Sequence, residues 1–313
     1  AFLVTSVFSG LAVGLLGMGW TLAIAIGLTV VALAHLLTLR IPEEEPERTP
    51  GAKAIDIRGA AAAIRVVPGL FALILFSTLN NLIGGVYMAL MDPYGLTLFD
   101  VKIWGVVLGV TATGFIIGGA VVAKWGLGRN PLRTMLLAVI AMGLLGALFT
   151  IRDWWWLYAA GIWAYMTLVP IIESAEQTVI QKVVPFTSQG RVFGAAATFE
   201  AAAAPVTAFL IAPIAQFWVI PYMESDAGRD AWGWLLGDGQ ARGIALVFLF
   251  AGFAMVVLTL LAFTTRSYRI LSARYSRSDP APGADAAASA APVPTVISPK
   301  DVIAGSAEGD PRR

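Results

Sequence analysis

The chain has 313 residues, of which 58% are hydrophobic and 13% charged, with a formal net charge of +1 and a mean hydropathy of +0.78. This composition lies outside the range of soluble domains and indicates an integral membrane protein. The absence of cysteine excludes disulfides and thiolate metal sites. His35 has no second histidine with which to share a metal, so we expect it to be a packed or interfacial side chain, and we expect no cofactor.

A membrane-spanning helix needs about 20 predominantly apolar residues. The sequence predicts an all-α membrane protein with eight such helices, at 2–17, 20–40, 68–91, 101–124, 132–151, 154–182, 191–222 and 243–266. Gly17 to Gly19 predict a tight hairpin between the first two. The chain starts inside an apolar run, without an initiator methionine or a basic flank. We therefore interpret it as a fragment.

Polar stretches divide the chain into four parts. Residues 1–42 hold the first two helices, and 43–66 form a polar loop that opens with EEEPER and closes with a short helix at the membrane interface. Residues 67–268 hold six helices. Residues 269–313 form a tail in which alanine, proline and small polar residues predict disorder.

Basic residues indicate the orientation of the helices. Most lysines and arginines fall in the 40–65 region, the turns at 124–133 and 182–191, and the tail. Only Lys102, Arg152, Arg229 and Arg242 fall on the other side. Under the positive-inside rule, the loop 43–66 and the C-terminus are cytoplasmic.

The third span carries amides near the middle of the membrane. Asn80 and Asn81 precede a glycine pair, a pattern typical of an interrupted helix that offers hydrogen bonds to a substrate, or of amides that join helices. Tyr87, two turns further on, is a further candidate for the substrate cavity. Asp92 and the Pro-Tyr-Gly sequence after it are interpreted as an interfacial cap at the end of this span.

The sixth span carries two carboxylates and an amide on one face. Glu173, Glu176 and Gln177 have the spacing i, i+3 and i+4, and Glu173 lies about 13 Å from Lys182 along the helix. Ionised groups are costly in lipid, so this face is expected to line a cavity or contact protein. Glu173 and Gln177 are predicted in the substrate cavity and Glu176 in a cytoplasmic gate. Pairing with Lys182 or Arg191 is the structural alternative.

Glu200 lies about 13 Å inside the seventh span, counted from Arg191, among small residues that leave room for a cavity. A lone carboxyl at this depth suits a group that binds and releases a proton or contacts a cationic substrate. A neutral, hydrogen-bonded structural carboxyl is the alternative.

Two resemblances to a known family add to this interpretation. The turn GGAVVAKWGLGRNPLR, residues 118–133, resembles the cytoplasmic-loop signature of the major facilitator superfamily. Ala123 stands where that signature has its acidic residue, so the acidic role is not carried over. The resemblance implies a basic latch formed by Lys124, Arg129 and Arg133, which we group with Arg191 and Glu176 in the cytoplasmic gate. Positive charges that only set the orientation are the alternative.

The run QKVVPFTSQGRVFGAA, residues 181–196, resembles the link between the tenth and eleventh helices of macrolide-efflux-like drug:proton antiporters. TLRIPEEEP, residues 38–46, and NNLIGGVYMALMDPYGL, residues 80–96, resemble their sixth and seventh helices. The resemblance implies that the eight spans correspond to helices five to twelve of a twelve-helix transporter.

This family implies a secondary active transporter in the cell membrane that exports a drug-like or metabolite molecule by alternating access, with Glu200 in proton coupling. Its partners would be the substrate, protons and the bilayer, without nucleic acid, and we expect a monomer. An importer or facilitator of the same fold is the alternative. An intramembrane enzyme is disfavoured because the sequence shows no catalytic motif.

The predicted topology is testable in the cysteine-free background. Cysteines placed at Ser225 and Ser278 should react with a membrane-impermeant maleimide from opposite sides of the membrane. Labelling of both from the same side would contradict the orientation and the number of spans.

Overall fold

The computed structural model describes residues 17–38, 57–237 and 241–277, which form helices joined by short turns. The predicted span 2–17 lies outside the described residues except for Gly17, as do 43–56 and the chain after 277. Within the described part, seven helical segments are long and apolar enough to cross a membrane. The expected total of eight therefore stays a prediction.

The seven segments follow the predicted spans closely. They are α2 (Met18–Thr38), α4 (Leu70–Leu98), α5 and α6 (Val101–Thr111 and Thr113–Trp125), α7 (Pro131–Leu148), α8 (Trp155–Val183), α9 with its extension, and α12 (Ala241–Thr264). The segment of α9 comprises α9 (Phe186–Ile214), the π-helical turn η1 (Ala215–Val219) and α10 (Ile220–Glu224). Shorter helices are α3 (Ile57–Val66), α11 (Asp226–Leu236) and α13 (Arg266–Arg277).

Local sequence signals set several helix ends. The Asp100 side chain accepts hydrogen bonds from the backbone N–H groups of Lys102 and Ile103, at 2.9 and 3.0 Å, and so caps α5. Asn130 caps α7 in the same way, through the N–H of Arg133, and Pro131 occupies the first turn. The π-helical turn lies between Pro213 and Pro221, where missing N–H donors interrupt the regular α-helical pattern.

Two boundaries differ from the sequence prediction. The third span does not end at Asp92: α4 continues through Pro93 to Leu98, and Asp92 accepts a hydrogen bond from the indole of Trp104 at 2.8 Å. The region expected to be a tail from residue 269 begins with α13, whose Leu271 and Tyr275 are buried. Apolar residues at helical spacing, Leu271 and Tyr275 among them, form the buried face of α13.

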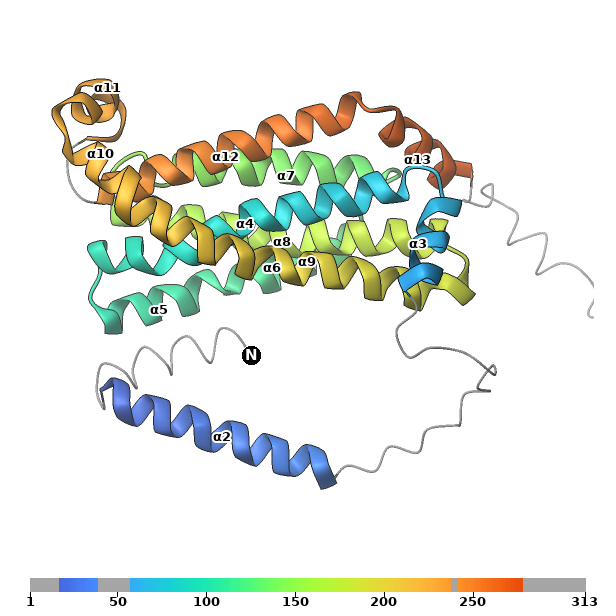
Figure 1. Cartoon of the computed structure of the whole chain (residues 1–313), viewed down its shortest axis with the longest axis horizontal. Helices are drawn as coiled ribbons and strands as arrows, with labels where there is room; N and C mark the ends of the chain where they lie inside the picture. Colours follow the sequence, from blue (N-terminus) through green and yellow to red (C-terminus); the bar gives the residue numbers. More distant parts are fainter. Residues whose placement is uncertain (1–16, 39–56, 238–240, 278–313) are drawn as a thin grey trace, which may run out of the picture. The chain divides into compact units, whose positions relative to one another are not determined.

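The helices pack as neighbours in a bundle (Figure 1). Helix α4 contacts α9 and α12, α7 contacts α12 and α8, and α8 also contacts α5 and α6. The tyrosines Tyr94 and Tyr158, together with Phe248 and Met255, are buried in the core between these helices. We call the end of the bundle that carries α11 the α11 end, and the opposite end the α13 end.

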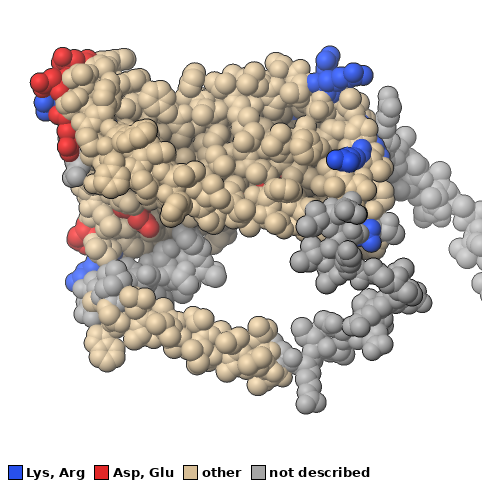
Figure 2. All heavy atoms as spheres, viewed as in Figure 1, with Lys and Arg blue, Asp and Glu red and all other residues tan. Residues whose placement is uncertain are grey.

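Charges separate between the two ends (Figure 2). In this view most Lys and Arg atoms gather at the α13 end and most Asp and Glu atoms at the α11 end, while the long surface between the ends shows almost no charged atoms. An uncharged band with charges at both ends is the arrangement that a bilayer requires.

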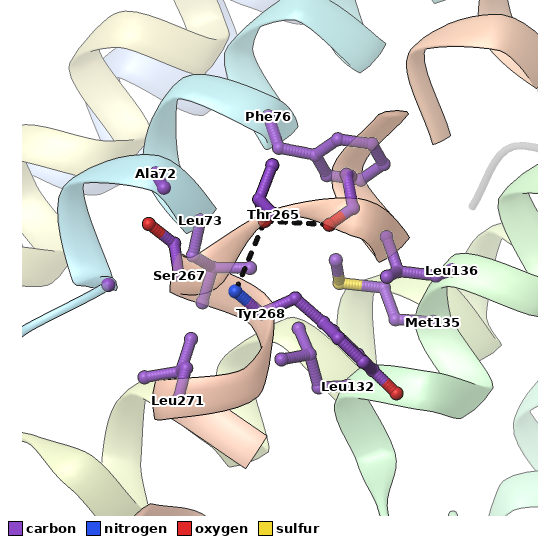
Figure 3. A pocket seen from close by; sticks show the side chains of 12 residues that line it. Ala72, Leu73, Phe76, Leu132, Met135, Leu136, Thr265, Ser267, Tyr268 and Leu271 are labelled. Atoms are coloured by element: carbon purple, nitrogen blue, oxygen red, sulfur yellow. Dashed lines mark hydrogen bonds between the residues drawn. The ribbon is translucent and has the colours of Figure 1, made fainter. Parts of the chain in front are cut away.

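Helix α13 is tied to three other helices. Asn130, the cap of α7, donates a hydrogen bond to Ser272 at 2.6 Å, and the Lys182 ammonium of α8 lies 4.2 Å from the ring centre of Tyr275. Between α4, α7, the end of α12 and α13 is a pocket of about 30 Å³ lined mainly by apolar side chains, among them Phe76 and Leu271 (Figure 3). It has room for about one water molecule, so it is a packing gap and no candidate for a substrate site.

Glycines allow the closest helix contacts. A Cβ atom on Gly114 of α6 would lie 2.6 Å from the carbonyl oxygen of Trp163 in α8, and one on Gly118 would meet the Thr167 carbonyl. Gly143 of α7 and Gly252 of α12 approach each other in the same manner. Small residues spaced four apart let two helix backbones approach, the usual device for packing helices in membranes.

Substituting Gly118 with valine should therefore destabilise the bundle by about 1–3 kcal/mol, because the new side chain overlaps the backbone of α8. Gly119 lies on the same helix, and a Cβ there meets nothing within 4 Å. Gly119→Val is thus the matched control. Thermal unfolding in detergent should show a lower melting temperature for Gly118→Val than for Gly119→Val, and equal melting temperatures would contradict the close approach.

Candidate functional site

A cavity of about 550 Å³ lies among helices α4, α6, α7, α8 and α9. This volume falls within the range of about 300–1,000 Å³ that is usual for small-molecule sites. Its walls are mainly apolar, with a few polar groups. The polar side chains that line it are Asn80, Asn81, Tyr165, Glu173, Glu176 and Glu200.

Helix α8 supplies two of the carboxyls. Glu173 and Glu176 lie one turn apart on α8, and both line the cavity. Glu176 is buried, with 8% of its surface exposed. Gln177 is exposed and is not among the lining residues, so the structure does not bring it to the cavity.

The third carboxyl comes from α9. Glu200 lines the same cavity, close to the carboxyl of Glu176, and the two side chains interact electrostatically. The buried Ser77 side chain, on α4, also lies near Glu176. The predicted gate residue Glu176 and the predicted coupling residue Glu200 thus lie side by side.

Helix α4 supplies the amides. Asn81 donates from Nδ2 to the backbone carbonyl of Ser77 at 3.0 Å. The Oδ1 atom of Asn80 is buried and has no hydrogen-bond partner among the described residues. The same is true of Oε1 of Glu176. Each of these two acceptor atoms has less than 1 Å² of accessible surface.

Aromatic side chains close the cavity toward the α11 end. Tyr165 lines the cavity, and its ring centre lies 5.3 Å from that of Tyr87. Tyr87 itself is not among the lining residues. It donates a hydrogen bond to the carbonyl of Phe248 at 3.0 Å and stacks on the ring of that residue. The structure thus places Tyr87 behind the cavity wall, although it was expected in the substrate cavity.

The basic residues expected in the gate lie away from the carboxyls. Lys124, at the end of α6, lies 4.7 Å from the ring centre of Trp125, and Arg129 and Arg133 occupy the exposed turn before and at the start of α7. Arg191 is exposed in the first turns of α9. None of these four lines the cavity. Within the described residues, the polar groups near the Glu176 carboxyl include Ser77, Glu173 and Glu200, and none of these three is basic.

The turn from α8 to α9 is closed by a side chain from the motif QKVVPFTSQGRV. Gln189 donates from Nε2 to the carbonyls of Gln181 and Val184, at 2.7 and 3.2 Å. These hydrogen bonds satisfy carbonyls that the end of α8 leaves without partners. The motif thereby fixes the turn that follows Glu176 on α8 and precedes Glu200 on α9.

The sequence analysis missed two polar side chains at or near the cavity, Tyr165, which lines it, and Ser77, which lies near Glu176 behind the lining. Ser77 lies three residues before Asn80 and four before Asn81, and this helical spacing could have placed it on the same face. Tyr165 lies eight residues before Glu173, about two helical turns, and this spacing could have placed the two side chains on the same face of the helix. Both were passed over because a single hydroxyl within an apolar helix is common.

A second polar cluster at the α11 end was also missed. The side chain of Arg242 is fully buried, at 0% exposure. It donates to the carbonyls of Thr150 and Leu236, both at 3.0 Å, and to the hydroxyl of Tyr94 at 2.7 Å. It also forms an ion pair with Asp153. The cluster joins α4, the α7–α8 connection, α11 and α12. Its members come from four separate segments, so no helical spacing in the sequence could predict that they meet.

Comparison with protein families now defines the class of the chain. The family model described as Major Facilitator Superfamily matches residues 1–208, and the chain belongs to this superfamily. With its apolar helices, it is a multi-pass membrane protein. A search of curated proteins finds no match.

Among solved structures, the chain is similar to the crystal structure of a bacterial homolog of the human lysosomal transporter Spinster, in an inward-facing and unoccupied conformation. The sequence identity is 17% and the TM-score is 0.49. The alignment covers 85% of this chain and 61% of the other, so the chain spans less than two thirds of the length of that transporter.

The Arg242 cluster yields a stability prediction. Arg242→Met should destabilise the protein by about 1–3 kcal/mol, because it leaves the buried Tyr94 hydroxyl and two carbonyls without their partner. Arg229→Met is the control, since Arg229 forms an exposed ion pair with Asp226 and should contribute at most about 1 kcal/mol. Thermal unfolding in detergent measures both. Equal effects would show that the buried cluster does not stabilise the α11 end.

Proposed function

We propose that the protein is a secondary active transporter that exports a small molecule in exchange for protons by alternating access. Superfamily membership supports transport, because members of this superfamily bind substrates near the membrane midplane between two helical bundles. The observation that carries the coupling is the close approach of the Glu176 and Glu200 carboxyls, from α8 and α9, in the mainly apolar cavity, where we propose that they share a proton.

The pair supports exchange for a physical reason. A proton shared between the two carboxyls would form a hydrogen bond that joins α8 to α9, and its loss places two like charges next to each other in a low-dielectric cavity. Loss of the proton therefore favours either separation of the helices or the arrival of a compensating positive group. Both events are steps that an antiporter needs, and Glu173 adds a third carboxyl one turn away.

The finer assignments belong to the same proposal. The motif resemblance supports the macrolide-efflux-like group and the correspondence to helices five to twelve, and the charge distribution supports a cytoplasmic α13 end and C-terminus in the cell membrane. Lys124, Arg129, Arg133 and Arg191, exposed at that end, would act as a latch on the cytoplasmic face. A monomer is proposed.

An importer or facilitator would use the same cavity but would not need the shared proton. The carboxyl pair therefore favours proton coupling over simple facilitation. Superfamily membership also favours a transporter over the intramembrane enzyme considered from the sequence.

The proposal predicts the behaviour of Glu200→Gln in proteoliposomes. We would impose a pH gradient and follow radiolabelled erythromycin, a cationic rhodamine ester and anionic fluorescein. The unmodified protein should move at least one of them along the gradient. In Glu200→Gln this movement should fall to the level of liposomes without protein, while exchange of the same compound without a gradient persists, because the variant lacks the group that carries the proton.

Glu224→Gln is the matched control, since Glu224 is exposed at the end of α10 and outside the cavity. It should keep gradient-driven movement. Unimpaired gradient-driven transport in Glu200→Gln would remove this residue from coupling and leave it as a structural carboxyl.

A further inference from the structure

We propose that helix α13 binds the headgroups of anionic phospholipids through its exposed face, which is formed by Arg266, Arg269, Ile270 and Ala273. The partner of this face is therefore the surface of the bilayer itself. The inference goes beyond the proposed function and does not depend on it, because it concerns the membrane contact of α13 and not the cavity.

Helix α13 begins where the last span ends. Helix α12 ends at Thr264 and α13 begins at Arg266. The hydroxyl of Thr265, between them, accepts a hydrogen bond from the backbone N–H of Tyr268 at 3.2 Å, and the chain changes direction at this cap (Figure 1). A helix that starts directly after a span lies at the depth of the lipid headgroups, so its first arginine is within their reach.

The helix has one face against the bundle and one exposed face. Leu271 and Tyr275 are buried against neighbouring helices. The exposed side chains follow the spacing i, i+3, i+4 and i+7, which places them on one side of the helix, and they are Arg266, Arg269, Ile270 and Ala273. Arginines beside apolar side chains are typical of a helix at the boundary between headgroups and acyl chains.

The buried face holds α13 in one orientation. Asn130 of α7 donates a hydrogen bond to Ser272 at 2.6 Å. A Cβ atom on Gly69, just before α4, would lie 2.9 Å from the carbonyl oxygen of Ser267, so the backbone of α13 packs closely on that segment. The two exposed arginines are thus presented by a helix that is already in place, which lowers the entropy lost when a partner binds.

The segments around this face carry no acidic residue. Helix α13, the turn at 118–133 and the turn at 181–191 contain no Asp or Glu, and Figure 2 shows basic atoms gathered at this end of the bundle. Within the described residues, the guanidinium groups of Arg266 and Arg269 have no ion-pair partner. Exposed cations without an anionic neighbour attract anions, and phosphate groups are the anions present at headgroup depth.

The chemistry of the face favours an anionic lipid over other anions. A planar guanidinium can donate two parallel hydrogen bonds to the oxygens of one phosphate. Phosphatidylcholine also carries a phosphate, but its own ammonium group offsets the charge. A soluble polyanion would meet the two charges, but it has no acyl chains to cover Ile270 and Ala273.

The test uses the cysteine-free chain with a single cysteine at Ala273 that carries a bimane label, in nonionic detergent. Phosphatidylglycerol and phosphatidylcholine with identical acyl chains are titrated into the protein, and glycerol phosphate serves as the free phosphate. We expect phosphatidylglycerol to shift the label emission at lower concentrations than phosphatidylcholine, with a response that weakens in high salt, and glycerol phosphate to have no effect. The same label at Ala227, exposed on α11, should show no preference for the anionic lipid.

Variants connect the response to the two arginines. Arg266→Gln and Arg269→Gln should each weaken phosphatidylglycerol binding about fivefold, the factor for one basic residue near an anionic membrane surface, and the double variant by more than about tenfold. The matched control combines Lys102→Gln and Arg152→Gln, which remove two exposed basic residues at the opposite end and change the net charge equally. It should keep the affinity of the unmodified protein. Unchanged melting temperatures without added lipid show that each variant is folded.

Three results would overturn the inference. The first is an equal response to both lipids, or a response that the double variant retains. The second is a shift by glycerol phosphate as large as that by phosphatidylglycerol, which would identify a site for soluble phosphate. The third is a label that ignores lipid but responds to Glu43→Gln, Glu44→Gln, Glu45→Gln and Glu47→Gln combined, which would assign the face to the acidic stretch 43–47. None of these results bears on gradient-driven transport, so they leave the proposed function to its own test.

Discussion

The proposed coupling depends on the proximity of the Glu176 and Glu200 carboxyls, because two ionised carboxylates side by side repel each other and a shared proton would remove that repulsion. Other parts of the bundle set the positions of the two carboxyls. Helix α4 adds the Ser77 hydroxyl, the Gln189 side chain fixes the turn between α8 and α9, and the apolar wall excludes competing charge. Gain or loss of a proton by this pair would therefore change the contact between α8 and α9 directly.

The two ends of the bundle differ in how they could respond. At the α11 end, Arg242 links four segments through fully buried hydrogen bonds, and aromatic rings in tilted and edge-to-face contact lie between it and the cavity. At the α13 end, the contacts include the hydrogen bond from Asn130 to Ser272 and the Lys182 ammonium over the Tyr275 ring. The two ends are therefore held by different kinds of contact.

Most of the architecture could be predicted from the sequence because hydrophobic length is a strong signal in membranes. Glu173, Glu176 and Glu200 could be placed on a cavity because carboxyls facing lipid are costly. The contact between Glu176 and Glu200 could not be predicted, since it depends on how α8 and α9 are rotated against each other. Tyr87 and Gln177 were assigned by spacing alone, and the rotation of their helices places one behind the wall and the other on the exposed surface.

The central claim is that the carboxyl pair shares a proton, and infrared spectroscopy of the protein in detergent tests it most directly. The account predicts an absorption band of a protonated, hydrogen-bonded carboxyl. This band should be lost or shifted in both Glu176→Gln and Glu200→Gln and unchanged in Glu224→Gln, whose carboxyl lies outside the cavity. Absence of the band in the unmodified protein, or a band that neither cavity variant alters, would contradict the account.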